Sequence, residues 1–168
     1  MIRELKEVIY DERANNGVWC RLPYPDHPRG CPNFPQCPSR YPDFKTLQGY
    51  KWFLIIEEFD LASHAEKMKE KHPEWTDRQC RNLLYWQNGV RSRLEVKAKA
   101  FYRPLLGDIL LEIPEACGVN MFETMSKAGI TLQRKHPNYI VKGILVGRLL
   151  SPFSSKTPYE KLAKEDSS

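Results

Sequence analysis

The stretch from Cys20 to Pro42 constrains this chain most, because its sequence is CRLPYPDHPRGCPNFPQCPSRYP. It holds seven of the thirteen prolines and three of the five cysteines. Proline fixes its own φ angle and has no amide hydrogen, so the stretch forms neither a helix nor a central strand. A long irregular loop in a compact domain is usually either disordered or held for a purpose. Its cysteines and aromatic rings favour the second case, and we predict a Pro/Cys-rich metal-binding loop.

The cysteines are best interpreted as thiols or metal ligands. The N-terminal residues MIRELKEVIYDER are charged throughout and lack the apolar core of an export signal. We therefore expect a cytoplasmic protein, in whose reducing surroundings disulfides do not persist. The longest uncharged apolar run is only Trp52 to Ile56, far short of the roughly 20 residues that span a bilayer, so we expect no membrane insertion.

The spacing of Cys20, Cys31 and Cys37 matches neither a zinc knuckle nor a bacterial-type ferredoxin run. Cys31 and Cys37 are each followed by proline, in a loop with little else to stabilise it. Thiolates bound to one metal centre would supply that stability, since metal-binding free energy becomes folding free energy in such segments. We predict these three cysteines as metal ligands.

A fourth ligand is expected from elsewhere in the chain. We prefer Cys117, in the sequence PEACGVN, because it follows a predicted strand and precedes a short helix whose dipole favours a thiolate. Cys80 is a reserve ligand that equally well fits a small buried hydrophobe. His27 would give a Cys₃His zinc site, although a loop histidine is more often simply solvated.

The remaining sequence predicts one small α/β domain over residues 1–150, followed by a polar tail over 151–168. Apolar residues make up 41% of the chain, enough for a conventional core. Hydrophobic periodicity and capping residues predict helices over 2–11, 61–71, 76–102 and 121–128, and strands over 50–59, 108–113 and 139–150. Helices that alternate with three strands suggest a three-stranded sheet, parallel or mixed, with flanking helices.

Two segments resemble the cysteine-rich "predicted metal-binding" protein family of unknown function. The first runs from Cys20 through CPNF and CPS to GYKWFLIIEEF, and the second is PEACGVNMFETMSKAGI. The resemblance implies a metal or iron–sulfur centre on Cys20, Cys31, Cys37 and Cys117, and no known reaction. Ser39 replaces the second proline of the family's Cys-Pro-Pro element, and LLGDILLEI replaces its central cysteine cluster. The chain is thus similar to a shortened version with one centre.

Thiolate ligation suits both iron–sulfur clusters and zinc, and spacing separates the two poorly. A [4Fe–4S] cluster is favoured, because an irregular loop plus one distant cysteine is a common way to assemble one; zinc is the alternative. Four cysteine ligands would give an electron-transfer or structural cluster with an unknown redox partner. Three would leave an iron open to a small-molecule substrate.

Two other functions remain open. The chain carries a net charge of +5, and the helix predicted within 77–103 has a basic face. A zinc-stapled module could use that face to bind nucleic acid through Arg78, Arg81, Arg91, Arg93, Lys97 and Lys99, although such residues are usually just solvated. Alternatively, Cys117 could act as a nucleophile with Glu115 or His136 as its base.

Overall fold

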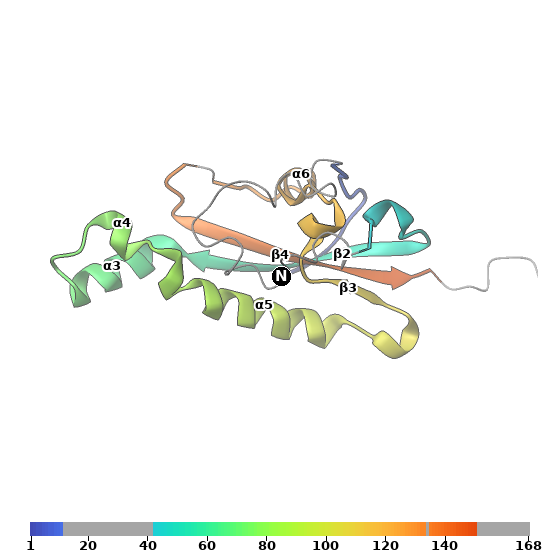
Figure 1. The fold of residues 1–168 in the computed structure, drawn as a ribbon, viewed down its shortest axis with the longest axis horizontal. Coiled ribbons are helices and arrows are strands. Elements are labelled where there is room, and N and C mark those ends of the chain that lie inside the picture. Colours follow the sequence, from blue (N-terminus) through green and yellow to red (C-terminus); the bar gives the residue numbers. More distant parts are fainter. Residues whose placement is uncertain (12–41, 134, 151–168) are drawn as a thin grey trace, which may run out of the picture.

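The computed structural model describes residues 1–11, 42–133 and 135–150, and a four-stranded sheet forms its centre (Figure 1). The strands are β1 (Ile2–Glu4), β2 (Tyr50–Asp60), β3 (Ile109–Leu111) and β4 (Tyr139–Leu149), in the order β1-β2-β4-β3. Every neighbouring pair is antiparallel.

The prediction of a three-stranded parallel or mixed sheet is therefore wrong. Because β2 and β3 both pair antiparallel with β4, these two strands do run in the same direction, as a strand–helix–strand unit requires. The last described strand, β4, inserts between them and makes each contact antiparallel. Hydrophobic patterning identifies strands but carries no information about such an insertion.

The missing fourth strand lies in the segment predicted as the helix 2–11. Ile2–Glu4 pairs with Phe53–Ile55, and backbone bonds from Leu5 N to the Trp52 carbonyl (2.9 Å) and from Ile56 N to the Met1 carbonyl (2.8 Å) extend the pairing. A helix of ten residues is only marginally stable by itself. The free edge of β2 offers these residues backbone partners, so tertiary pairing overrides the helical spacing.

The central pair, β2 and β4, is aligned over eleven residues, from Tyr50 opposite Leu149 to Asp60 opposite Tyr139. β4 continues without interruption through Gly143. A Cβ atom at Gly143 would lie 2.5 Å from Met125 Cε and 2.7 Å from Leu54 Cδ1. The glycine therefore lets α6 approach the sheet closely.

The helices are α3 (Leu61–Lys71), α4 (Asp77–Cys80), α5 (Gln87–Phe101) and α6 (Met121–Lys127), with short 3₁₀ helices η2 (Phe44–Thr46), η3 (Leu83–Tyr85), η4 (Pro104–Leu106) and η5 (Pro114–Cys117). Side chains of Asp60 and Asn120 cap α3 and α6, as expected. The continuous helix predicted over 76–102 is wrong: it is divided into α4, η3 and α5, because Asn82 and Trp86 start new helical segments.

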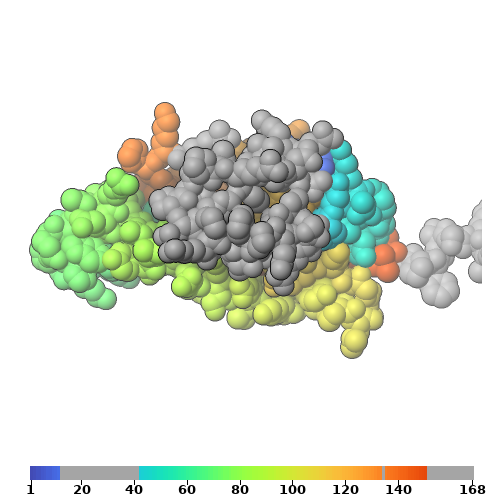
Figure 2. All heavy atoms as spheres, viewed as in Figure 1, coloured from blue at the N-terminus to red at the C-terminus, as the bar shows by residue number. Residues whose placement is uncertain are grey.

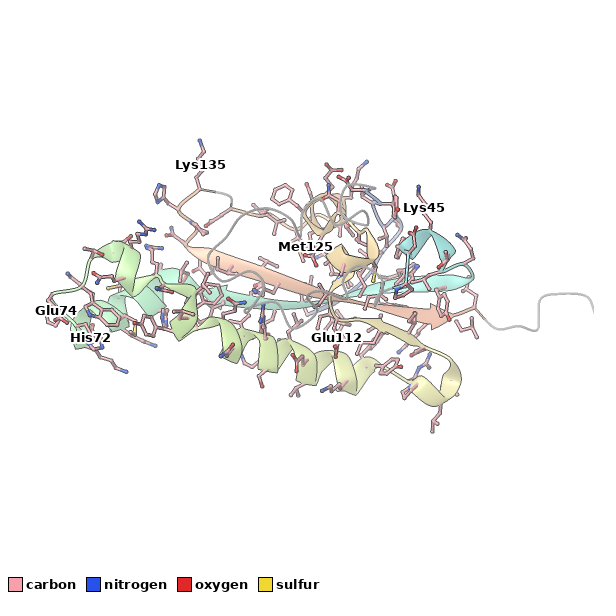
Figure 3. All side chains as sticks on the ribbon, viewed as in Figure 1. Lys45, His72, Glu74, Glu112, Met125 and Lys135 are labelled. Carbon is pink, nitrogen blue, oxygen red and sulfur yellow. The ribbon has the colours of Figure 1, made fainter. Side chains whose placement is uncertain are left out.

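Helices cover both faces of the sheet. On one face, α5 buries Val90, Leu94 and Ala98, which recur every four residues, and its cluster includes Ile55 and Ile144. On the other, α6 and η5 pack on a larger cluster; Figure 3 labels Met125 there. That cluster comprises Leu5, Trp52, Leu54, Ile56, Leu111, Cys117, Val119, Met121, Met125 and Leu145.

Candidate functional site

Only two of the predicted ligands fall within the described residues. Cys20, Cys31, Cys37 and His27 lie outside them. Cys80 and Cys117 are both described, both buried, and in neither is the sulfur part of a disulfide. The geometry of the candidate centre is therefore built from these two thiols and from the chain on either side of residues 12–41.

Cys117 ends η5, immediately after β3 and before α6. Its side chain is fully buried in the α6-side cluster, with Val119 and Leu145. Gly118 follows with φ +91°, a left-handed conformation that lets the chain turn sharply from η5 toward the α6 cap, Asn120. The turn, which we call the Cys117 turn (residues 117–120), fixes the thiol at a defined point of the core.

The chain that leads into residues 12–41 is bound to the Cys117 turn. Asp11 N donates to the Gly118 carbonyl at 2.7 Å, and Asn120 N donates to the Ile9 carbonyl at 2.8 Å. Between these bonds, Tyr10 forms an antiparallel bridge with Val119. The last described residue before the cysteine-rich stretch therefore lies beside the neighbour of Cys117.

The chain that leaves residues 12–41 contacts Tyr10 of the chain that enters them. The Tyr10 hydroxyl donates to Asp43 Oδ2 at 3.5 Å, and Lys45 Nζ lies 4.2 Å from the centre of the Tyr10 ring. Phe44 then packs on Trp52, with ring centres 4.9 Å apart. The first flank of the segment with three predicted ligands is therefore bonded to the Cys117 turn, and the second flank contacts the first through Tyr10.

Cys80 lies elsewhere in the molecule. It ends α4, whose start is capped reciprocally by Thr76 and Gln79, and its side chain is 1% exposed. Figure 1 shows α4 with α3 at one end of the long axis, away from the residues around α6. Its position therefore fits the interpretation as a small core residue.

The proposed bases for Cys117 differ in position. His136 is exposed, and its neighbour Pro137 accepts a hydrogen bond from Arg81, so His136 belongs to the α4 end of the molecule. The structure does not bring it to Cys117. Glu115 lies two residues before Cys117 and keeps an exposed surface, yet desolvation by surrounding protein raises its pKa despite the opposing charge of Lys142.

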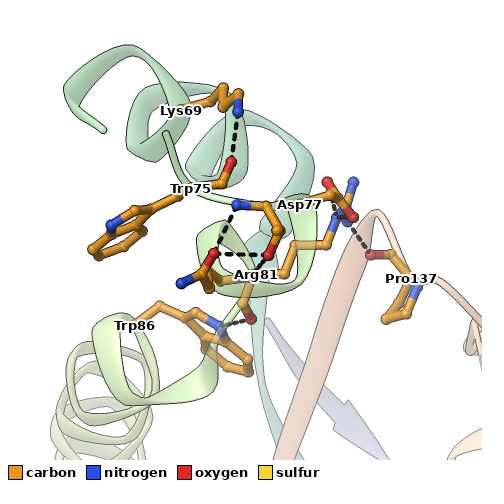
Figure 4. A network of polar contacts seen from close by, with 8 residues as sticks. Lys69, Trp75, Asp77, Arg81, Trp86 and Pro137 are labelled. Carbon is orange, nitrogen blue, oxygen red and sulfur yellow. Dashed lines mark hydrogen bonds and ion pairs between the residues drawn. The ribbon is translucent and has the colours of Figure 1, made fainter. Parts of the chain in front are cut away.

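Several of the predicted nucleic-acid-binding residues are engaged within the protein. Arg81 Nε contacts Asp77 Oδ1 at 2.9 Å, and its Nη1 donates to the Pro137 carbonyl at 3.1 Å (Figure 4). The Trp86 indole donates to the Arg81 carbonyl at 3.2 Å and stacks on Phe59. The Trp86 ring is thus part of the internal packing. Of the predicted nucleic-acid-binding residues, Arg78 and Lys99 are exposed.

Arg93 and Lys97 of α5 both bind Glu57 of β2. Arg93 Nε donates to Oε1 at 2.6 Å, and Lys97 Nζ donates to Oε2. The Glu57 side chain is only 7% exposed. Its burial raises the carboxyl pKa, but the hydrogen bonds and charges of Lys97 and Arg93 outweigh that effect and leave the pKa below its ordinary value.

The sequence analysis did not identify Lys142, a further cation on the face of the sheet that α5 covers. Lys142 of β4 stands directly opposite Glu57 in the sheet register and is half-buried. Burial and the nearby charge of Arg91 lower its pKa, and Glu115 opposes the shift. An isolated lysine in an apolar strand is a weak sequence signal, and only the register reveals its neighbours.

Comparison with known proteins gives no match: no protein-family model matches the chain, and neither a curated protein nor a solved structure resembles it significantly. Within the described ranges, no three His, Cys, Asp or Glu residues gather as potential metal ligands. In the same residues, no helix is long and apolar enough to cross a membrane.

Proposed function

We propose that this protein binds a metal centre through the thiolates of Cys20, Cys31, Cys37 and Cys117, with an iron–sulfur cluster favoured over zinc. The observation that carries the proposal is that the chain enters residues 12–41 beside the Cys117 turn, and that the residues after this segment contact Tyr10 in the entering chain. Asp11 is hydrogen-bonded to Gly118, and Tyr10 contacts Asp43. The segment with three cysteines thus begins beside Cys117, and its two flanks contact each other through Tyr10.

The chemistry of the donor set fits this proposal. Four soft thiolates suit iron–sulfur clusters and Zn²⁺, and they do not suit Mg²⁺ or Ca²⁺. A buried thiolate without a cation would be costly in the apolar cluster around Cys117, and a bound metal would offset that cost. When bound, an iron–sulfur cluster supplies one-electron redox chemistry, or Lewis acidity if one iron lacks a cysteine.

The protein's own residues would position the centre. Gly118 and the Asn120 cap fix the backbone that carries Cys117, and Thr124 of α6 accepts a hydrogen bond from Ile9 N at 3.0 Å. These contacts tie the entry to residues 12–41 to the helix behind the thiol. The proposal places the protein in the cytoplasm, where thiols stay reduced, with a redox protein or small molecule as partner.

The test is metal analysis with an absorption spectrum on protein purified without oxygen. We expect iron and sulfide with a broad band near roughly 400 nm for a cluster. About one zinc per chain in a colourless protein would support a closed four-ligand site instead. Protein without either metal, after reconstitution with iron and sulfide or with zinc has also failed, would refute the proposal.

Matched cysteine variants identify the ligands. Cys117→Ser and Cys80→Ser both place a hydroxyl in a fully buried site, so each loses stability for the same reason. Of these two variants, only Cys117→Ser is expected to lose the metal. The serine variants of Cys20, Cys31 and Cys37 are also expected to lose it. Equal metal content in Cys117→Ser and the wild type would remove Cys117 from the ligand set.

A further inference from the structure

A cleft opens where the N-terminal chain separates from β2. In the described residues, the backbone bonds between these two segments end with the one from Leu5 N to the Trp52 carbonyl, at 2.9 Å. The N-terminal chain then crosses to the Cys117 turn through Tyr10, whereas β2 stays paired with β4 along its whole length. Between these two paths lies a cleft of about 620 Å³, lined mainly from residues 5–10 and 44–52, which we call the η2 cleft.

The floor of the η2 cleft is aromatic. The Trp52 side chain is buried, and the rings of Phe44 and Tyr50 lie against it, with ring centres 4.9 and 5.8 Å from that of Trp52. Phe44 and Tyr50 are half-buried and line the cleft, as does Leu47. Apolar and aromatic walls with few polar groups are typical of small-molecule sites, which occupy roughly 300–1,000 Å³. The η2 cleft has the size and the lining of such a site.

The cleft is open beside Gly49. This glycine lines it with φ +77°, and a Cβ atom here would meet no heavy atom of the described residues within 4 Å. Leu150 N donates to the Gly49 carbonyl at 2.8 Å, which fixes the turn into β2. Figure 2 shows residues 42–50, in cyan, on the surface at one end of the long axis, beside a small blue part of residues 1–11. A small ligand can enter the cleft from this side.

The charged side chains that line the η2 cleft are mostly positive. They are Lys6, Glu7, Lys45 and Lys51. Lys51 Nζ lies 2.9 Å from a carboxylate oxygen of Glu4, and Glu7 Oε2 lies 4.0 Å from Lys127 Nζ. Each of these pairs has no net charge. Lys6 and Lys45 are the remaining charged groups of the lining, and both are exposed.

Lys45 is held at a defined place on the wall of the cleft. Its ammonium lies 4.2 Å from the centre of the Tyr10 ring, and Tyr10 also lines the cleft. The Asp43 carboxylate supports this arrangement, because it accepts from the Lys45 backbone N at 3.0 Å and from the Tyr10 hydroxyl at 3.5 Å. Figure 3 labels Lys45 on η2. A lysine ammonium has three donors, so one that lies over a ring can also bind a carboxylate.

We propose that the η2 cleft binds a small aromatic acid, with its ring against Phe44 and Tyr50 and its carboxylate at Lys45. Aromatic rings pack favourably on one another in offset or edge-to-face contacts, and the ligand ring would remove these half-buried side chains from water. The ammonium supplies a charge-assisted hydrogen bond to the carboxylate, and Lys6 adds positive potential. No cysteine lines the cleft in the described part of the chain, so the site is distinct from the proposed metal centre.

Calorimetric titration of the purified full chain with naphthoate and with benzoate, at constant ionic strength, tests this proposal. Saturable binding of either acid, at one site per chain, supports it. The neutral naphthamide keeps the ring but loses the charge-assisted hydrogen bond, so it should bind at least about tenfold more weakly than naphthoate. Lack of binding by both acids at millimolar concentration, or equal affinities for naphthoate and naphthamide, would overturn the proposal.

A pair of variants tests the role of Lys45. Lys45→Gln should weaken the binding of naphthoate by about tenfold and leave that of naphthamide within about twofold, because only the acid uses the charge. Lys99→Gln is the matched control, since Lys99 is an exposed lysine of α5, on the other face of the sheet. It should bind naphthoate within about twofold of the wild type. Equal losses in the two variants would contradict the assignment of Lys45.

Photolabelling of the wild type locates the site without any variant. Benzoylbenzoate is an aromatic acid whose ketone cross-links to nearby C–H bonds under ultraviolet light. We expect mass spectrometry to find the label in peptides that contain residues 5–10 or 44–52, and excess naphthoate to suppress it. Labels only in peptides that contain neither range, or labels that naphthoate does not reduce, would refute the site.

Discussion

Replacing Glu57 by glutamine removes the negative charge of the buried side chain that Arg93 and Lys97 of α5 bind. The substitution keeps the shape of the side chain, so the packing around it is conserved. The amide presents one acceptor and one donor, whereas Arg93 and Lys97 both need an acceptor. One cation therefore faces an NH₂ group in the variant, and we expect the free energy of unfolding to fall.

The magnitude follows from the exposure of the partners. Breaking a fully buried ion pair costs about 3–5 kcal/mol. Here the Glu57 side chain is 7% exposed, but those of Arg93 and Lys97 are 52% and 45% exposed. Both cations regain water when they lose the Glu57 carboxylate. One of the two hydrogen bonds also survives. We expect a loss of about 2 kcal/mol, which lowers the melting temperature by about 4–8 °C in a chain of this length.

Urea unfolding at pH 7, followed by tryptophan fluorescence, measures this loss. Glu58→Gln is the control, because Glu58 is the exposed neighbour on the opposite face of β2. It should change the unfolding free energy by less than about 0.5 kcal/mol. An equal effect of both substitutions would show that the contacts of Glu57 with α5 contribute nothing to stability.

The same pair of proteins predicts a pH dependence. The pKa of Glu57 is lower in the folded than in the unfolded protein, so its contribution is complete above the unfolded value, about 4.3. It is lost as the pH falls through the folded pKa. The difference in unfolding free energy between wild type and Glu57→Gln should therefore shrink as the pH falls below the unfolded pKa. A difference that stays constant down to pH 3 would refute this assignment of the charge.

Three further substitutions test other parts of the structure by the same unfolding assay. Thr124→Val removes the acceptor of Ile9 N and should cost about 1–3 kcal/mol, because a partly buried donor is left without its partner; no loss would mean that this contact is dispensable. Gly118→Ala should cost about 1–3 kcal/mol from backbone strain at φ +91° and should also reduce metal content. Asp108→Asn weakens the contacts between Arg103 and the Asp108 carboxylate, whose side chain is 1% exposed, and should cost about 1–2 kcal/mol. No change in stability would mean that water replaces these contacts fully.

Much of the local structure was predictable from the sequence, because local chemistry fixes it. Asp60 and Asn120 cap the helices that they precede, and the apolar run around Leu54 forms the central strand. The sheet topology was not predictable, since a short strand such as Ile2–Glu4 exists only through its partner. Likewise, periodicity alone could not show that Trp86 would start a separate helix.

The residues of the candidate sites were also predictable from the sequence only in part. The sequence preferred Cys117 to Cys80 because Cys117 follows a predicted strand and precedes a short helix. The backbone bonds of Asp11 and Asn120 add a second reason, which spacing in the sequence does not encode. Lys142 was missed because its significance arises from Glu57, 85 positions earlier in the sequence and directly across the sheet.

The place of β4 in the sheet has a consequence for synthesis on the ribosome. β4 is the last described strand, yet it lies between β2 and β3. Until residue 149 has emerged, the nascent chain has no strand to join its two halves, and β2 and β3 expose unpaired edges. Folding of this sheet therefore waits until β4 has emerged, and a chain that stalls before β4 is a ready substrate for chaperones or for aggregation.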